Sequence, residues 1–429
     1  FYGTITGGGS FYDPTSLCRD NRFITPENDP EYKPAKFYYT DAIGDQASRF
    51  VREHAAGHAE APFFLYVAFT AAHWPMHAPE EDVAKYRGRY DGGYEPARAE
   101  RFRRLRELGI IRPGWELSPQ EGDWAKVEHK AWEARCMEVY AAMVDRMDRN
   151  VGRLVAALKE TGALDRTLLF YLQDNGACAE PMGRTDNPDW HLKDVKPMGP
   201  DELQTEIWPP MRTRDGRAVL GGPGVMPGPA DTYIGCGRDW ANVSNTPFRR
   251  YKHFIHEGGI STPLIAHWPD GIARHGELEP EPGQLPDLMA TCVDVSGATY
   301  PAERNGRPVP PMEGRSLVPA FRGKPIERDG LFWEHEGNRA VRVGHWKLVA
   351  KDPDGPWELY DMEADRTEMH DLAAAQPERV RELAAKWEQW ARRVKALPWP
   401  WKPAYGAAVK GAAKGKIPPA PAPAAPPAR

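Results

Sequence analysis

The chain has 429 residues, of which 41% are hydrophobic and 27% charged, as is ordinary for a soluble globular enzyme. Its formal net charge of -5 gives no reason to expect a nucleic acid or an anionic membrane as a partner. No apolar stretch approaches the ~20 residues that a membrane span needs. The five cysteines are scattered and show no CxxC spacing, so they predict neither a zinc site nor a disulfide framework.

Helical and strand patterns alternate over the first 300 residues. The expected elements are a helix over 41–57, a strand over 62–69, a long helix over 137–158, and strands over 167–173 and 262–268. Gly162 is typical of a helix end and precedes the second strand. Short apolar strands separated by helices predict an α/β catalytic domain over 1–300, with a mixed sheet sandwiched by helices.

The remainder of the chain follows other patterns. The polar, Gly/Pro-rich stretch 180–247 is too long for an ordinary connection and is interpreted as an insertion that covers a pocket. A helix over 285–297 is expected to end the large domain. Residues 301–400 predict a small α+β domain, in which short antiparallel strands pack on one amphipathic helix. The Pro/Ala-rich tail 401–429 is predicted to be disordered.

Polar groups follow two of the predicted strands. Asp174, Asn175 and Gly176 come directly after one strand, and His73 lies in the loop after another. Ligands bind beyond the carboxyl ends of strands in open α/β sheets, and carboxylate and amide oxygens suit Ca²⁺ or Mg²⁺ rather than zinc. Asp-Asn-Gly is equally good chemistry for a turn, so the tripeptide alone leaves both interpretations open.

Three motifs occur in order along the chain: HWPMHAP, DNG and RYKHFIHEGGISTPLIAHWP. Together they closely resemble the formylglycine-dependent sulfatases, the arylsulfatase branch of the alkaline-phosphatase-like superfamily. The resemblance extends from FYGTITGGGSFYDP to WELYDMEADRTEMHDLA and covers about residues 1–395. It implies a sulfuric ester hydrolase that acts on a small-molecule or carbohydrate sulfate ester.

The resemblance also implies roles for single residues. Asp174 and Asn175 match the second pair of calcium ligands, with Ca²⁺ favoured over Mg²⁺. His73 matches the histidine beside the ester oxygen, and Lys252 matches the lysine that contacts the sulfate. An anionic sulfate needs cations around it and a departing alkoxide needs an acid, so the physical chemistry agrees. His253 is adjacent to Lys252, and sequence alone does not separate the two.

Other aromatic and histidine residues near these motifs are interpreted as structural or as pocket wall. They are His77, His256, His267, Trp74, Trp240 and Trp268.

One part of the family pattern is missing. No cysteine or serine of the chain is followed by Pro-Ser/Ala-Arg at the spacing that is converted to formylglycine, and the upstream Asp-Asp pair of the calcium site is absent. Since the chain also begins at Phe1 rather than Met, we expect it to be an N-terminally truncated fragment that is inactive by itself. The parent is expected to be matured by a formylglycine-generating enzyme and, by family analogy, to be periplasmic or secreted.

Two rival functions stay open. The first is a phosphatase, phosphodiesterase or phosphonate hydrolase of the same superfamily, although Asn175 beside the strand-end Asp favours one hard ion over two zinc ions. The second is a non-catalytic protein that keeps the sulfatase fold as a binding module.

Overall fold

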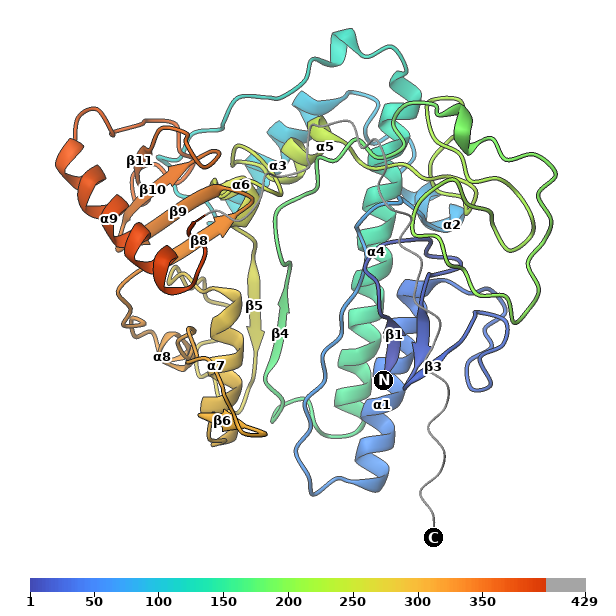
Figure 1. The fold of residues 1–429 in the computed structure, drawn as a ribbon, viewed down its shortest axis with the longest axis horizontal. Helices are drawn as coiled ribbons and strands as arrows, with labels where there is room; N and C mark the ends of the chain where they lie inside the picture. The colour runs from blue at the N-terminus through green and yellow to red at the C-terminus, as the bar shows by residue number, and fades with distance from the viewer. Residues whose placement is uncertain (399–429) are drawn as a thin grey trace.

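The computed structural model describes residues 1–398, and its elements run in the order shown in Figure 1. The helices are α1 Tyr39–Gly57, α2 Glu80–Val83, α3 Tyr94–Glu107, α4 Lys130–Glu160, α5 Arg238–Ser244, α6 Glu257–Ile260, α7 Leu285–Ser296, α8 Val318–Phe321 and α9 Pro377–Arg393. The strands are β1 Tyr2–Thr4, β2 Leu17–Arg19, β3 Arg22–Phe23, β4 Leu169–Leu172, β5 Leu264–His267, β6 Glu303–Arg304, β7 Arg307–Pro308, β8 Leu331–His335, β9 Asn338–Val343, β10 Trp346–Ala350 and β11 Glu358–Asp361. Short 3-10 helices lie at Ala84–Tyr86, Trp124–Lys126 and Pro188–Trp190.

The two long helices α1 and α4 pack side by side, as Figure 1 shows. Gly44 makes this close approach possible, because a Cβ atom there would lie 2.2 Å from the side-chain oxygen of Asn150. The amide nitrogen of Asn150 in turn donates a hydrogen bond of 2.9 Å to Asp41. The predicted helices over 41–57 and 137–158 are therefore confirmed, and α4 extends the second one by several residues at its N-terminal end.

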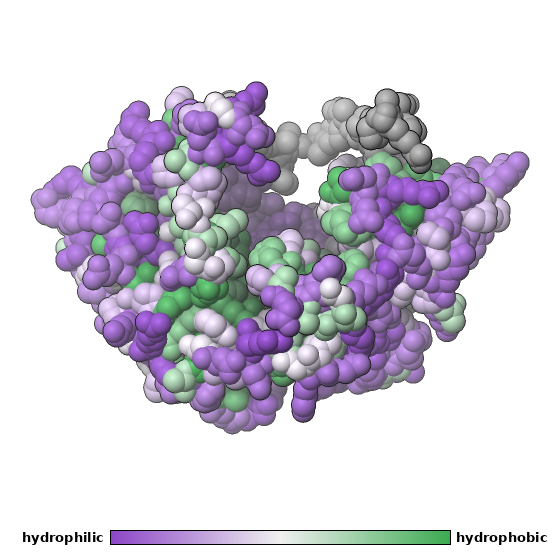
Figure 2. All heavy atoms as spheres, turned by 90° about the horizontal axis from the view of Figure 1, so that it is seen from below, coloured by the Kyte–Doolittle hydropathy of each residue, from purple (hydrophilic) through white to green (hydrophobic). Residues whose placement is uncertain are grey.

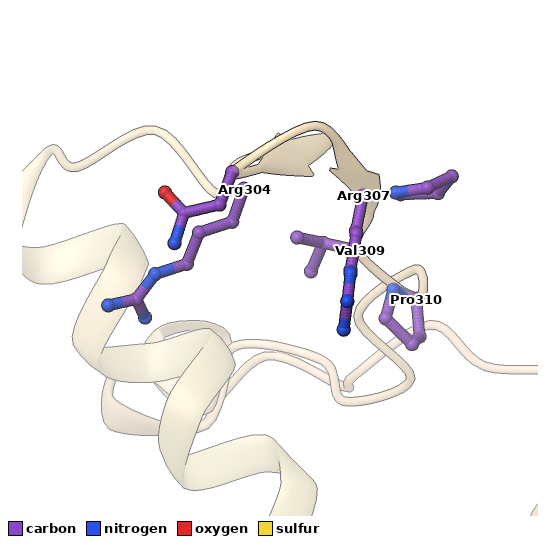
Figure 3. Close-up of a pocket in the computed structure, with 6 residues that line it drawn as sticks. Arg304, Arg307, Val309 and Pro310 are labelled. Carbon is purple, nitrogen blue, oxygen red and sulfur yellow. The ribbon is translucent and has the colours of Figure 1, made fainter.

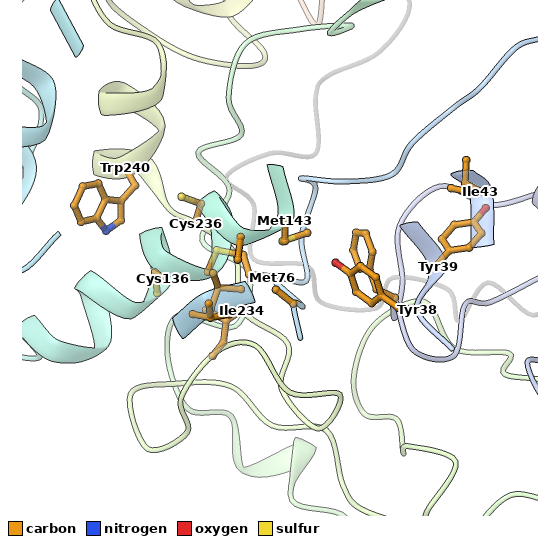
Figure 4. Close-up of a cluster of buried hydrophobic side chains, with 14 of the residues drawn as sticks. Tyr38, Tyr39, Ile43, Met76, Cys136, Met143, Ile234, Cys236 and Trp240 are labelled. Atoms are coloured by element: carbon orange, nitrogen blue, oxygen red, sulfur yellow. The ribbon is translucent and has the colours of Figure 1, made fainter. Parts of the chain in front are cut away.

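The largest buried cluster lies where α1 and α4 meet the segments around Met76, Ile234 and Trp240. Figure 4 shows its sulfur-containing and aromatic side chains, among them Met143 and Tyr38. Trp240 is fully buried, so it is a core residue and does not line an open pocket.

Strands β4 and β5 pair antiparallel and have helices on both faces. Leu169 packs with Val51 of α1 and Leu158 of α4, whereas Phe170 packs on the other face against the α7–α8 region, including Phe321. Consecutive side chains of a strand point to opposite faces, so helices cover both sides of this pair. The α/β layering expected from the sequence is confirmed.

The prediction of a strand over 62–69 is wrong. Within the described chain this segment runs extended but does not belong to a sheet. Phe64 and Tyr66 are each 80% exposed, while Leu65 packs between α1 and α4. The alternation of a strand is present, but a strand also needs a hydrogen-bonded neighbour, and none pairs with it within residues 1–398.

Apolar side chains gather around a hollow on the face seen in Figure 2. Leu264 and Ile265 of β5, together with Leu285 and Met289 of α7, are between 45% and 58% exposed. Such a surface is unusual for a monomer and favours further contacts there. No helix of the described residues is long and apolar enough to cross a membrane.

The C-terminal part is a four-stranded antiparallel sheet in the order β11-β10-β9-β8. One face packs on α9, where Leu348 and Leu359 of the sheet meet Trp387. The other face covers the segment before α6, where Val349 and Tyr360 meet Ile255. The predicted small sheet with one helix is confirmed, and the sheet lies against the chain that carries Lys252. The tail predicted to be disordered, 401–429, lies outside the described residues.

Candidate active site at the strand ends

The loop after β4 is held against the α6 region by backbone contacts. The amide of Gly176 donates to the carbonyl of Gly259 over 2.9 Å, and a Cβ atom at residue 176 would lie 1.8 Å from the carbonyl oxygen of Gly258. Only glycine allows this approach. Strand β4 gives way to Asp174 and Asn175 because the chain then turns and bonds the 249–260 segment.

Asp174 and Asn175 lie at the upper end of β4, and the Asp174 side chain is exposed. The amide nitrogen of Asn175 donates a hydrogen bond of 2.8 Å to the carbonyl of Gly176. This bond uses the nitrogen end of the amide, so the oxygen is the atom with which Asn175 would coordinate an ion. Two consecutive residues thus offer hard oxygen ligands, which fits Ca²⁺.

The segment 249–260 brings Lys252 to the same loop. The backbone amide of Lys252 donates to the carbonyl of Ala177 over 3.0 Å, and the side-chain oxygen of Asn245 accepts a hydrogen bond of 2.9 Å from the amide of Ala177. The ammonium group of Lys252 donates to Glu180 Oε1 over 3.2 Å. Lys252 is therefore fixed at both its backbone and its side chain.

His73 lies in the turn after the extended 62–69 segment. Its Nδ1 lies 2.9 Å from the carbonyl of Trp74, so Nδ1–H donates and Nε2 is the nitrogen that faces away from this bond. Burial lowers the pKa of His73; the bond to Trp74 and the charges of Glu180 and Asp174 oppose this effect, while Lys252 adds to it. The structure thus brings His73, Lys252 and Asp174 within electrostatic reach of one another.

Glu180 joins these groups and was not predicted from the sequence. One carboxylate oxygen accepts from the indole N–H of Trp74, and the other accepts from Lys252 and from His253 at 2.8 Å. Burial opposes ionisation of Glu180, but the hydrogen bonds from His253 and Trp74 and the charge of Lys252 outweigh it and hold its pKa well below the usual range. The only sequence signal was a carboxylate six residues after Asp174.

Lys252 and His253 share Glu180 Oε1 but differ in their other contacts. His253 Nε2 bonds Glu180, and its Nδ1 lies 3.2 Å from Glu336, which belongs to the β8–β9 turn. Lys252 therefore lies between Glu180 and the strand-end loop, while His253 turns toward the C-terminal sheet.

The remaining histidines lie apart from this group. His77 is buried, bonds the carbonyl of Thr232 over 2.7 Å, and has a pKa lowered by burial to about 4. His256 is also buried and lies 3.3 Å from Glu358, whereas His267 is exposed on β5. These environments indicate structural or surface roles.

The long stretch 180–247 folds back on the site. Its side chains Met211, Val219 and Tyr233 are buried, and Trp74 packs against this group with its ring centroid 5.8 Å from that of Tyr233. The stretch thus supports Trp74, whose ring in turn lies 4.4 Å from that of His73.

A surface hollow elsewhere offers no comparable chemistry. Figure 3 shows Arg304, Arg307, Val309 and Pro310 of the β6–β7 hairpin around it. In Figure 1 this hairpin lies beside the lower end of β5, whereas α6 lies above the upper end. The hollow therefore lies at the opposite end of β5 from α6.

Comparison with known proteins assigns the chain to a family. The family model described as Sulfatase matches residues 4–298, and a second model, N-sulphoglucosamine sulphohydrolase, C-terminal, matches residues 249–394. The chain belongs to the sulfatase family. This family is part of the alkaline-phosphatase-like superfamily, as the resemblance implied.

Two curated relatives of this sulfatase illustrate the similarity. The chain is 30% identical over 407 residues to an uncharacterised sulfatase of Schizosaccharomyces pombe, covering 90% of the chain and 69% of the relative. It is 32% identical over 321 residues to an arylsulfatase of Klebsiella aerogenes, covering 72% of the chain and 63% of that enzyme. The chain thus spans about two thirds of the length of these relatives.

Solved structures show the same fold. One is a complex with its substrate D-glucosamine-2-N,6-O-disulfate, with a TM-score of 0.55, 18% identity, and coverage of 91% of this chain and 74% of that one. Another is a complex with a neocarrahexaose, with a TM-score of 0.52, 22% identity, and coverage of 87% of this chain and 62% of that one.

Proposed function

We propose that this sulfatase-family protein hydrolyses sulfate esters at the upper end of β4. Two observations support it: Lys252 bonds Glu180 beside the loop that follows β4, and the charges of Lys252, Glu180 and Asp174 all act on His73, at the end of a strand where α/β folds bind ligands. A cation, a histidine and hard oxygen ligands are the groups that an anionic ester with a poor leaving group requires.

Asp174 and Asn175 would supply two of the oxygen ligands of a calcium ion. When bound, the ion would offset the negative charge of the sulfate group and of the transition state. Lys252 would supply further positive charge, and its hydrogen bond to Glu180 holds the ammonium group in place until the ester arrives.

His73 is proposed as the acid that protonates the departing oxygen. When the S–O bond to the alcohol breaks, a proton on Nε2 would move to that oxygen, while Nδ1–H keeps its bond to Trp74. Burial and Lys252 hold the pKa of His73 low before substrate binds, and the negative charge of a bound sulfate ester would raise it. The substrate would thus promote the protonated form that its own cleavage needs.

The nucleophile is proposed to be a formylglycine that is not among residues 1–429, because the sequence holds no matching Cys or Ser motif. Its formation by a maturing enzyme and an extracytoplasmic location are part of the same proposal. We expect residues 1–429 alone to release no sulfate from a chromogenic aryl sulfate above a buffer control. Sulfate release that is lost on His73→Ala would require a nucleophile within these residues.

Sulfated carbohydrates are the proposed substrate class, supported by the disulfated glucosamine named for one protein of the same fold. The decisive assay uses a longer protein that includes the nucleophile motif of the family. It compares the rates of hydrolysis of an aryl sulfate, an aryl phosphate and an aryl phosphonate. We expect sulfate release to dominate and to fall about 100-fold or more in His73→Ala. His58→Ala, which changes an exposed histidine of the α1 C-terminus, should leave the rate unchanged. A preference for phosphate or phosphonate would favour the rival hydrolase, and no turnover of any ester would favour a binding module.

A further inference from the structure

A second group of ligating side chains lies beside the candidate active site. His253 comes from the segment before α6, His335 is the last residue of β8, and Glu336 lies in the turn between β8 and β9. Within residues 1–398 this is the group of three such residues whose ligand atoms all lie within 4.8 Å of one another. Two separate parts of the fold therefore meet at these side chains.

The spacing of the three groups matches a metal site. His253 Nδ1 lies 3.2 Å from Glu336 Oε2 and 3.4 Å from His335 Nε2, and His335 Nε2 lies 3.8 Å from Glu336 Oε1. Tetrahedral zinc has bonds of about 2.0–2.1 Å to nitrogen and oxygen, so its ligand atoms are about 3.3–3.4 Å apart. The two distances from His253 Nδ1 are close to this spacing, whereas the contact of His335, which is made to the other carboxylate oxygen of Glu336, is longer.

The hydrogen bond on the far side of His253 favours the same conclusion. His253 Nε2 lies 2.8 Å from Glu180 Oε1, while its Nδ1 lies 3.2 Å from Glu336 Oε2. A histidine that binds zinc through one nitrogen and a carboxylate through the other is the usual arrangement of such sites.

The two loops are also locked together by their backbones. The side-chain amide of Asn338 donates to the carbonyls of His253 over 2.9 Å and of His335 over 3.1 Å. His253 and Glu336 both have positive φ angles, of 82° and 55°, which non-glycine residues rarely adopt. The fold thus tolerates two unfavourable backbone conformations that hold these side chains in place.

We propose that His253, His335 and Glu336 bind a zinc ion at the junction of the catalytic region and the C-terminal sheet. Two imidazoles and one carboxylate suit zinc, whereas calcium prefers a set of oxygen ligands. The site differs from the calcium site proposed at Asp174 and Asn175 in its ligands and in its metal.

The test is calorimetric titration of Zn²⁺ into the protein in buffer saturated with calcium. We expect one zinc per chain, and affinity reduced at least tenfold by His335→Ala and by the nearly isosteric Glu336→Gln. His370→Ala is the matched control, because this histidine also contacts a carboxylate, that of Glu116 at 2.9 Å, but lies outside the cluster. Unchanged zinc affinity in both cluster variants, or no stoichiometric zinc binding by the wild type, would overturn the proposal.

Calcium and zinc titrations together separate the two metal proposals. Asp174→Ala should weaken calcium binding and leave zinc binding unchanged, while His335→Ala should do the reverse. Replacement of zinc by Co²⁺ adds a spectroscopic readout, since tetrahedral coordination by nitrogen and oxygen gives visible absorption that Glu336→Gln should diminish. Absorption of equal intensity in that variant would contradict the ligand set.

Discussion

Two ionic clusters lie only five residues apart in the 249–260 segment, and they differ in nearly every physical respect. The first surrounds Glu257, which with Glu368 contacts the ammonium of Lys347 at 2.7 and 2.8 Å, with all three residues buried. The second surrounds Lys252 and His253, which share the half-buried carboxylate of Glu180. Both clusters connect the segment to other parts of the fold.

The difference between the clusters is in how completely their charges are matched. Glu257 also receives a hydrogen bond of 3.0 Å from Arg366, and Glu368 receives one of 2.9 Å from the amide of Glu257. These carboxylates have their partners within the protein, so they fix the C-terminal sheet and leave nothing for a ligand. The Glu180 cluster keeps a lysine and histidines at an accessible position, as chemistry on an anion requires. The 249–260 segment therefore takes part in one cluster that stabilises the fold and in another that offers groups for chemistry.

The largest expected effect is on stability and concerns the buried cluster around Glu257. Lys347→Met should lower the free energy of unfolding by about 3–5 kcal/mol, because it leaves two buried carboxylates without their shared cation. Urea unfolding measures the change. Lys351→Met, at an exposed lysine of the adjacent turn, should cost less than about 0.5 kcal/mol. Equal unfolding midpoints for the two variants would show that the buried cluster does not stabilise the fold.

The next effect is on turnover and distinguishes Lys252 from His253. It is measured in a longer protein that includes the nucleophile. Lys252→Ala should reduce turnover about 100-fold or more, since it removes positive charge beside the sulfate. His253→Ala should be milder, because this residue faces Glu336 and the C-terminal sheet. Steady-state kinetics in calcium buffer without zinc provide the measurement. The reverse order of loss would mean that the assignment of Lys252 to the sulfate is wrong.

A smaller effect is expected from pH at Glu358, which contacts Arg249 and His256 of the 249–260 segment. Burial opposes its ionisation, but hydrogen bonds with His256 and Tyr360 and the charge of Arg249 lower its pKa to about 2. A depressed pKa stabilises the fold above the unfolded value of 4.5, and this stability is lost as the pH falls from there toward about 2.

Glu358→Gln removes this titration. Between about pH 5 and pH 3 its free energy of unfolding should fall by about 2 kcal/mol less than that of the wild type. Urea unfolding at several pH values measures both slopes. Parallel curves would mean that Glu358 ionises alike in the folded and unfolded chains.

Much of this arrangement could be predicted from the sequence, because it is encoded locally. Apolar spacing predicted the long helices, and Gly162, with a φ of 67°, follows the end of α4 as expected. The strands over 167–173 and 262–268 also formed. The segment 62–69 has the pattern of a strand without a paired neighbour, and pairing depends on the rest of the fold.

The candidate site residues Asp174, His73 and Lys252 belong to motifs that can be read one at a time in the sequence. Their roles stay a prediction. Glu180 and Glu336 could not be predicted, because their importance arises only when a loop and the β8–β9 turn meet His253. Such tertiary contacts leave no periodic or local signature.

The central proposal is a calcium-dependent anion site at the C-terminal end of β4. Calorimetric titration of Ca²⁺ tests for this site most directly. In a protein that also includes the upstream segment with the Asp-Asp pair of the calcium site, Asp174→Ala should weaken calcium binding at least about tenfold. The reason is that the substitution removes a charged oxygen ligand. Glu336→Gln, which changes a carboxylate of the neighbouring cluster, should bind calcium as the wild type does. Calcium affinity that is unchanged in Asp174→Ala would remove this residue from the site and contradict the account.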